Sequence, residues 1–356
     1  MSQRNFKKFY LDNILDLLWR QWSALGALGG MPAEDTWIID PEALLVFSLE
    51  MARYEPRLFE EILGWLVVNN KWIDIQRLRG IIKTKDEKTK RLTSAVSYFL
   101  SHEAKSYRRK WQALALLNRP IPALEKETLF KTKEGVSYPE PKPRSDIFDD
   151  YGFIRGQVSL RNTAGSVLAT GKSNSRFLLR SLFGIGSRSE SLLYLLTHEA
   201  GHPASVARAI GISVRGTQDA LIELSGSGLV MTRASGKRKI EYWLDKKRWW
   251  EFISGAAFDE KSIPLWLDWV ALFSALMSVW HALLDTEKAD SDYMRSSKLR
   301  EVMESAGVGF AKSGLNLPPI PGRHVRPERY EEDFQHFITE VLGKLHRPQK
   351  SPAPLK

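Results

Sequence analysis

The chain has 356 residues and is 43% hydrophobic, which suits two or three packed domains and argues against a largely disordered protein. It contains no cysteine, so disulfides, thiolate catalysis and cysteine-ligated zinc are excluded. The net charge of +10 is concentrated in two blocks, net +9 over residues 71–120 and net +6 over residues 176–250. Localised positive charge is typical of proteins with a polyanionic partner.

Residues 1–125 predict a helical N-terminal domain. Residues 1–22 mix charged and apolar side chains at helical spacing, so they indicate an amphipathic helix rather than a signal peptide. Asp40 and Pro41 predict a helix start, with an N-cap followed by proline at the first helical position. Further helical stretches continue until the chain reaches Pro120.

Residues 126–175 are predicted to be a linker or an extended arm. The stretch KETLFKTKEGVSYPEPKPRSD at its start is polar and carries three prolines. The glycine pattern FGIGS at 183–187, further along the chain, lacks a preceding strand and a lysine. It therefore predicts a turn rather than a phosphate loop.

Residues 176–250 alternate helical and turn signals in a fixed order. A leucine-rich helix is followed by a break at Gly201, and a short second helix ends at Gly211. Ser213 is suited to cap a third helix, which glycines terminate. Two strands around a basic turn follow, so the order is helix, helix, helix, hairpin.

The segment SVRGTQDALIELSGSGLV, residues 213–230, resembles the recognition helix of MarR- and ArsR-like winged-helix regulators. Those families show a serine, polar residues, A-L-x-x-L, and then Gly-Leu-Val before the wing. The likeness covers about a fifth of the chain, residues 176–250. Gly216 departs from it, because glycine inside a helix costs about 1 kcal/mol relative to alanine. The resemblance implies a winged helix-turn-helix that binds double-stranded DNA.

Helical phase divides the third helix into two faces, with Thr217, Ala220, Leu221 and Leu224 expected to point inward. On the outward face, arginine can recognise guanine and glutamine can recognise adenine. The predicted recognition-helix contacts are Ser213, Val214, Arg215, Gln218, Asp219 and Ile222. The predicted wing contacts, suited to phosphate, are Arg233, Lys237, Arg238 and Lys239.

A competing motif, HEAGH, spans residues 198–202 and matches the H-E-x-x-H pattern of zinc hydrolases. That chemistry needs both histidines on one continuous helix. Gly201 and Pro203 interrupt such a helix, so His198 and His202 are expected to be loop residues. No metal site is predicted, and zinc hydrolysis is kept as a distant third function.

Residues 251–345 predict a helical C-terminal domain, followed by a disordered tail at 346–356. The segment 263–284 is long and apolar enough to span a bilayer, but Asp268 and His281 argue against a span. An internal core helix or a dimerisation helix are the two remaining interpretations.

The sequence therefore predicts a mainly α protein, in which helical N- and C-terminal domains flank a central winged helix-turn-helix with a small β-hairpin wing. The expected function is sequence-specific binding of double-stranded DNA by a cytoplasmic homodimer, a repressor of its own or a neighbouring operon. No enzymatic activity and no cofactor are expected, while an effector ligand or partner protein is left open. The alternative is a protein-interaction module, such as an antitoxin or an accessory subunit of a defence or toxin system.

Overall fold

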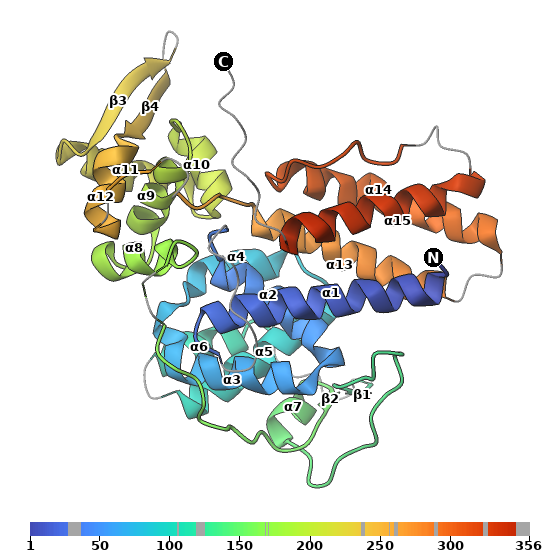
Figure 1. Ribbon diagram of the computed structural model, residues 1–356. Helices are drawn as coiled ribbons and strands as arrows, with labels where there is room; N and C mark the ends of the chain where they lie inside the picture. Colours follow the sequence, from blue (N-terminus) through green and yellow to red (C-terminus); the bar gives the residue numbers. More distant parts are fainter. Residues whose placement is uncertain are drawn as a thin grey trace.

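The computed structural model describes residues 1–27, 37–104, 107–118, 125–167, 169, 171–235, 239–255, 257–259, 263–287, 291–322 and 327–346. Over these residues the protein is mainly helical, as predicted, with two small two-stranded sheets (Figure 1).

Helices from both ends of the chain form one helical body. Its members are α1 (Gln3–Ala24), α2 (Pro41–Met51), α3 (Pro56–Asn69), α4 (Ile75–Lys83), α5 (Glu87–Glu103), α6 (Arg108–Ala115), α13 (Trp269–Thr286), α14 (Asp292–Lys312) and α15 (Pro327–His346), with short 3-10 turns η1 (Ala52–Tyr54) and η2 (Asn70–Trp72). Phe47 of α2 stacks on Phe273 of α13, with ring centroids 4.4 Å apart. The segments expected to form separate N- and C-terminal domains thus share one hydrophobic core.

Helix α2 begins as its sequence predicts. Asp40 is its N-cap and accepts a hydrogen bond from the Ala43 amide at 3.0 Å, while Pro41 occupies the first helical position. Every residue of α2 is buried, so the helix runs through the middle of the body.

Helix α13 contains most of the apolar segment 263–284. It is long and apolar enough to cross a membrane, with a mean hydropathy of 1.3, yet 56% of it is buried inside the protein. The Tyr10 hydroxyl donates a hydrogen bond to the Leu276 carbonyl at 2.6 Å, which ties α13 to α1. This packing favours the core-helix interpretation of the segment.

The predicted arm, residues 126–175, follows the surface of the body and is partly ordered by it. Strand β1 (Glu127–Thr128) pairs in parallel with β2 (Phe153–Ile154), and α7 (Asp146–Asp150) lies between them in the chain. Leu129 and Phe148 are fully buried in the core of the body. The arm is therefore extended, as expected, but it is packed rather than free.

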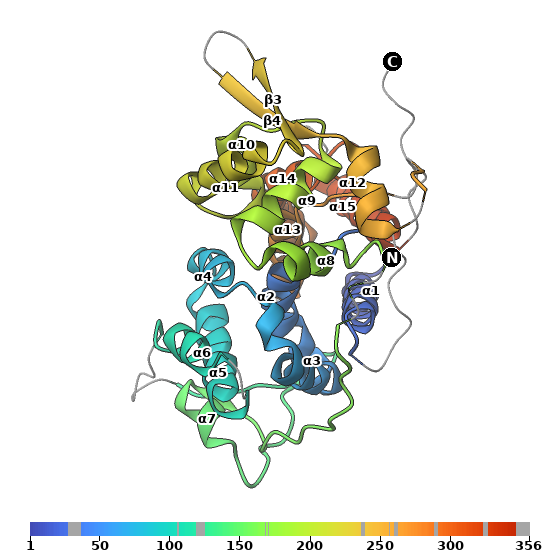
Figure 2. The ribbon, with the colours of Figure 1, turned by 90° about the vertical axis from the view of Figure 1, so that its left-hand side faces the viewer.

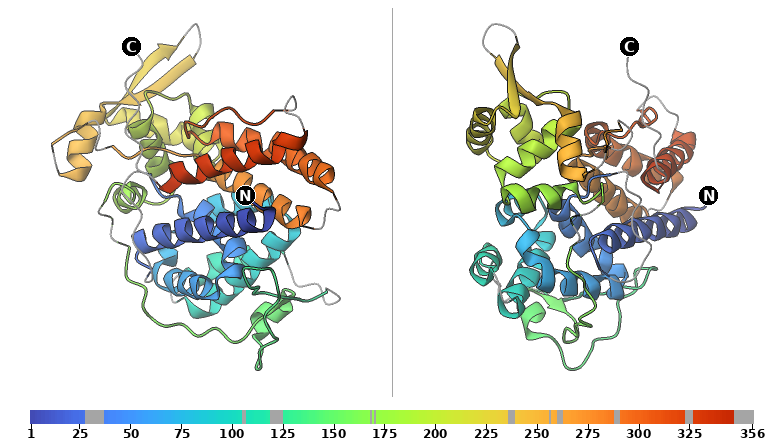
Figure 3. Two further views of the ribbon diagram at one scale, coloured as in Figure 1. Left: turned by 45° about the vertical axis from the view of Figure 1, so that its right-hand side comes forward. Right: turned by 60° about the vertical axis from the view of Figure 1, so that its left-hand side comes forward.

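Residues 187–254 form a second unit with its own hydrophobic core, here called the hairpin unit. It consists of α9 (Ser187–Thr197), α10 (Pro203–Ile210), α11 (Val214–Gly226), β3 (Val230–Ser235), β4 (Lys239–Leu244) and α12 (Lys246–Ser254). Figure 3 shows its hairpin projecting away from the helical body. Helix α8 (Ser175–Phe183) lies between the two, as Figure 2 shows, and contributes Phe177 to one core and Leu179 to the other.

Candidate nucleic-acid interface

Helix α11 is built from local signals that the sequence displays. Gly211 ends α10 with a φ of +70°, a conformation that glycine adopts without strain. The Ser213 side chain then caps α11 by accepting a hydrogen bond from the Gly216 amide at 3.2 Å. Thr217, Ala220 and Leu221 are buried against the rest of the hairpin unit, in the predicted phase.

The opposite face of α11 is exposed along its length. The Arg215 side chain is 95% exposed, and the two apolar residues Val214 and Ile222 are 50% and 51% exposed. Arg215 lies 4.0 Å from Asp219, one helical turn away, in a loose ion pair. All six predicted recognition residues lie on this surface, called the exposed face of α11: Ser213, Val214, Arg215, Gln218, Asp219 and Ile222.

The predicted hairpin is present as the antiparallel pair β3–β4, with Val230 opposite Leu244 and Ser235 opposite Lys239. Lys239 is exposed. Two other predicted wing contacts, Lys237 and Arg238, lie outside the described residues.

Arg233, the fourth predicted wing contact, is not a free cation. Its guanidinium donates hydrogen bonds to Glu241 at 3.1 Å and to Glu199 at 3.2 Å. These hydrogen bonds raise the pKa of Arg233. Both carboxylates offset its charge, so it offers less to a phosphate than the sequence suggested.

The HEAGH segment lies between two helices, as expected. Helix α9 ends at Thr197, and His202 is the N-cap of α10, where its Nδ1 accepts a hydrogen bond from the Ala204 amide at 3.3 Å. The His198 ring stacks on Tyr194, with centroids 3.9 Å apart, and burial lowers the pKa of His198. The two imidazoles therefore belong to different local structures.

Gly201, at the centre of the same segment, attaches the hairpin to this loop. Its backbone exchanges two hydrogen bonds with Tyr242 of β4, each 2.9 Å long. A β-carbon at this position would lie 2.5 Å from Cγ2 of Val206 and 2.8 Å from Cε1 of Tyr194. The close approach of the loop to α10 and α9 therefore requires glycine.

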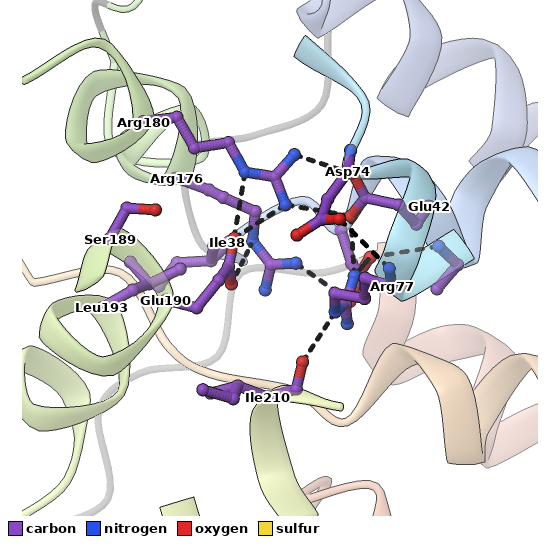
Figure 4. A network of polar contacts seen from close by, with 12 residues as sticks. Ile38, Glu42, Asp74, Arg77, Arg176, Arg180, Ser189, Glu190, Leu193 and Ile210 are labelled. Carbon is purple, nitrogen blue, oxygen red and sulfur yellow. Dashed lines mark hydrogen bonds and ion pairs between the residues drawn. The ribbon is translucent and has the colours of Figure 1, made fainter. Parts of the chain in front are cut away.

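A buried ionic network joins the hairpin unit to the helical body (Figure 4), and the sequence did not reveal it. Three arginines and three carboxylates take part, all almost fully buried: Arg77, Arg176, Arg180, Asp40, Glu42 and Glu190. Asp40 and Glu42 begin α2, and Arg77 lies on α4. The two other arginines lie on α8, and Glu190 lies on α9.

Each arginine in the network bridges several elements. Arg180 donates to Glu42 at 2.8 Å and to Glu190 at 2.7 Å. Arg77 donates to Asp40 at 2.6 Å and to Glu42 at 2.7 Å. Its Nε also donates to the carbonyl of Ile210, the last residue of α10, at 2.7 Å. The end of α10 is therefore fastened directly to α4.

The network keeps Asp40 and Glu42 ionised despite their burial. Burial by itself would raise the pKa of Asp40, but Arg176 and Arg77 outweigh it and hold that pKa far below its usual range. The pKa of Glu42 is also lowered, because Arg180 and Arg77 lower it more than burial raises it. The equal numbers of opposite charges explain how six ionic groups can be buried together.

Part of the positive charge of residues 176–250 is not available on the surface, because the network contains it. Arg176 and Arg180 are two of its basic residues, and both are buried. Arg188 is held by Glu223 at 2.6 Å on the surface. Part of the basic excess that suggested a polyanion therefore stabilises the protein itself.

Comparison with known proteins adds no relative. No protein-family model matches the chain, and no curated protein or solved structure is similar to it.

Proposed function

We propose that the protein is a sequence-specific, double-stranded DNA-binding regulator in which the hairpin unit acts as a winged helix-turn-helix. Helix α11 is then the recognition helix, and β3–β4 is the wing. The observation that carries the proposal is the exposed face of α11, which no other part of the described chain covers and which leads directly into a projecting hairpin (Figure 1).

The chemistry of that face suits base recognition. Arg215 and Gln218 are both exposed near the N-terminal end of α11, the end that contacts base edges in helix-turn-helix proteins. Arginine binds guanine bidentately, and glutamine does the same with adenine. The proposal is therefore a binding protein without catalysis, acting as a cytoplasmic repressor of its own or a neighbouring operon.

A homodimer belongs to this proposal, because helix-turn-helix proteins commonly bind two half-sites as two-fold pairs. Since most of helix α13 is packed in the core of the body, we expect the dimer contact to lie mainly on other surfaces of the helical flanks. Light scattering at micromolar concentration, with and without DNA, tests the dimer. A monomer mass under both conditions would remove the dimer from the proposal and leave DNA recognition standing.

One observation favours a second candidate, a protein-interaction module such as an antitoxin or accessory subunit. Val214 and Ile222 are half exposed on the same face, and Arg215 is balanced by Asp219. A face that is nearly neutral and partly apolar also suits a protein partner.

Selection from a random duplex pool, followed by binding titrations, separates the two candidates. We expect the wild-type protein to enrich a defined motif. Arg215→Ala and Gln218→Ala should each weaken binding to it by about 1–3 kcal/mol, with little effect on unrelated duplexes. Arg4→Ala, an exposed arginine on α1, serves as control and should bind normally. A pool that enriches no sequence would contradict DNA recognition and favour the protein partner.

A further inference from the structure

A groove of about 480 Å³ lies between α4, α6 and the turn that precedes α9. Four basic residues line it: Lys71, Arg79, Arg109 and Lys110. They belong to the stretch 71–120, whose net charge of +9 the proposed recognition helix leaves unexplained.

These four cations are exposed, and within the described part of the chain none of them has a carboxylate within 4.0 Å. Elsewhere on the surface, Arg20, Lys90 and Arg144 each pair with a neighbouring acid. In the groove, Lys71 and Lys110 instead lie over aromatic rings, those of Trp72 at 5.2 Å and Tyr107 at 4.7 Å.

A single acid, Asp74, lines the groove, and its carboxylate is already engaged. Its Oδ1 caps α4 by accepting hydrogen bonds from the amides of Gln76 at 3.0 Å and Arg77 at 3.1 Å. The groove lining therefore carries four cations and one carboxylate, and this excess of positive charge is the arrangement that binds phosphate groups.

The groove lies next to the flank of α11. Ile185 lines both the groove and an adjoining hollow of about 310 Å³, whose other wall includes Gly216, Asp219 and Glu223 of α11. Figure 2 shows α11, α4 and α6 on the same side of the molecule. The bond from Arg77 to Ile210 fixes α10 on α4, so the hairpin unit cannot turn freely relative to the groove.

We propose that this groove binds the phosphodiester backbone of the duplex, beyond the segment that the recognition helix contacts. This inference rests on the proposed function. Phosphate contacts of this kind position a protein on DNA without reading sequence. Three separate elements, η2, α4 and α6, supply the cations, which suits an extended backbone. The positive charge of residues 71–120 would then serve DNA binding, because the groove lengthens the stretch of duplex that the protein contacts.

The test compares two duplexes that share the selected motif: a short one that ends at the motif, and a long one that extends it by about 10 base pairs, one helical turn, on each side. Binding is measured by fluorescence anisotropy over a range of salt concentrations. The groove variant Arg79→Ala with Lys110→Ala is compared with Arg4→Ala with Lys8→Ala. The control removes the same charges from exposed positions on α1, on the opposite side of the body from α4 and α6 (Figure 2).

We expect the groove variant to bind the long duplex about tenfold more weakly and the short duplex as wild type does. Its salt slope on the long duplex should fall by up to about 1.8, at about 0.9 for each phosphate that the variant no longer neutralises. The control should match the wild type on both duplexes. Far-UV circular dichroism verifies that every variant is folded.

Normal binding of the long duplex by the groove variant would overturn the inference and leave the proposed function intact. An equal loss on both duplexes would also overturn it, because the groove would then lie within the segment contacted by α11. If the wild-type protein binds neither duplex, the proposed function is contradicted. The inference about the groove is then contradicted too, because it rests on that function.

Discussion

At the scale of single residues, the HEAGH segment has a structural role, which Gly201 shows most directly. Gly201 holds β4 through two backbone hydrogen bonds, in a space that leaves no room for a β-carbon. We expect Gly201→Ala to lower the free energy of unfolding by about 1–3 kcal/mol, as overpacking usually does. Urea denaturation followed by circular dichroism measures this.

Gly226→Ala is the matched control, because a β-carbon there meets no atom within 4 Å. This substitution, at the end of α11, should leave stability unchanged or raise it by up to about 1 kcal/mol. Equal stability of the two variants would contradict the steric role of Gly201.

The histidines of the same segment give a second prediction. His198 is stacked on Tyr194, while His202 caps α10, so a zinc ion has no pair of imidazoles one helical turn apart. We expect the purified protein to carry no stoichiometric zinc, and His202→Ala to cost about 0.5–1 kcal/mol because the cap is removed. Elemental analysis that finds one zinc per chain, absent from His202→Ala, would revive the hydrolase interpretation.

At the scale of elements, the sequence predicts best where the determinants are local. Capping residues and apolar spacing located α2 and α11, including the inward phase of Thr217 and Leu221. Partners distant in sequence could not be predicted. Arg233 finds Glu199 only because the loop after α9 lies beside the hairpin, and nothing in the spacing of Arg180 indicates Glu42.

Two cations of the hairpin, Lys239 and Arg233, should contribute differently to DNA binding. Lys239 is exposed, whereas Arg233 is held by Glu199 and Glu241. We expect Lys239→Ala to weaken binding to all duplexes equally and to reduce the salt slope by about 0.9. Arg233→Ala should change that slope less, because its charge is already offset. A loss confined to the selected motif would contradict a backbone role for Lys239.

At the scale of the whole molecule, the buried network makes the folded protein sensitive to acid. The pKa values of Asp40 and Glu42 are lowered in the folded state, so the unfolded chain binds protons first. The stabilisation that these two ionised carboxylates provide is complete when the pH is above their pKa values in the unfolded chain, about 4. It is lost progressively as the pH falls below those values.

We therefore expect the free energy of unfolding to decrease steadily between about pH 4.5 and pH 3. Asp74, Glu60 and Asp268 have raised pKa values, mainly through burial, and act in the opposite direction, which reduces the slope. The Asp40→Asn variant should be less stable than the wild type at pH 7, and its free energy of unfolding should depend less on pH over the acid range. An unchanged acid slope in this variant would show that Asp40 is not responsible.

The same network predicts how the two units depend on each other. Arg180 contacts Glu42 of the body and Glu190 of the hairpin unit, and its side chain is fully buried. Arg180→Met leaves an uncompensated buried charge, which typically costs about 3–5 kcal/mol. Arg188→Met is the control, because its partner Glu223 is exposed and such surface pairs contribute at most about 1 kcal/mol.

Calorimetry then distinguishes a shared from an independent unfolding transition. We expect one transition in the wild type and in Arg188→Met. In Arg180→Met the hairpin unit should unfold at a lower temperature than the body, because one of its ionic attachments to α2 is lost while its own core is intact. A single transition, shifted no further than that of the control, would mean that Arg180 does not determine how the two units are coupled.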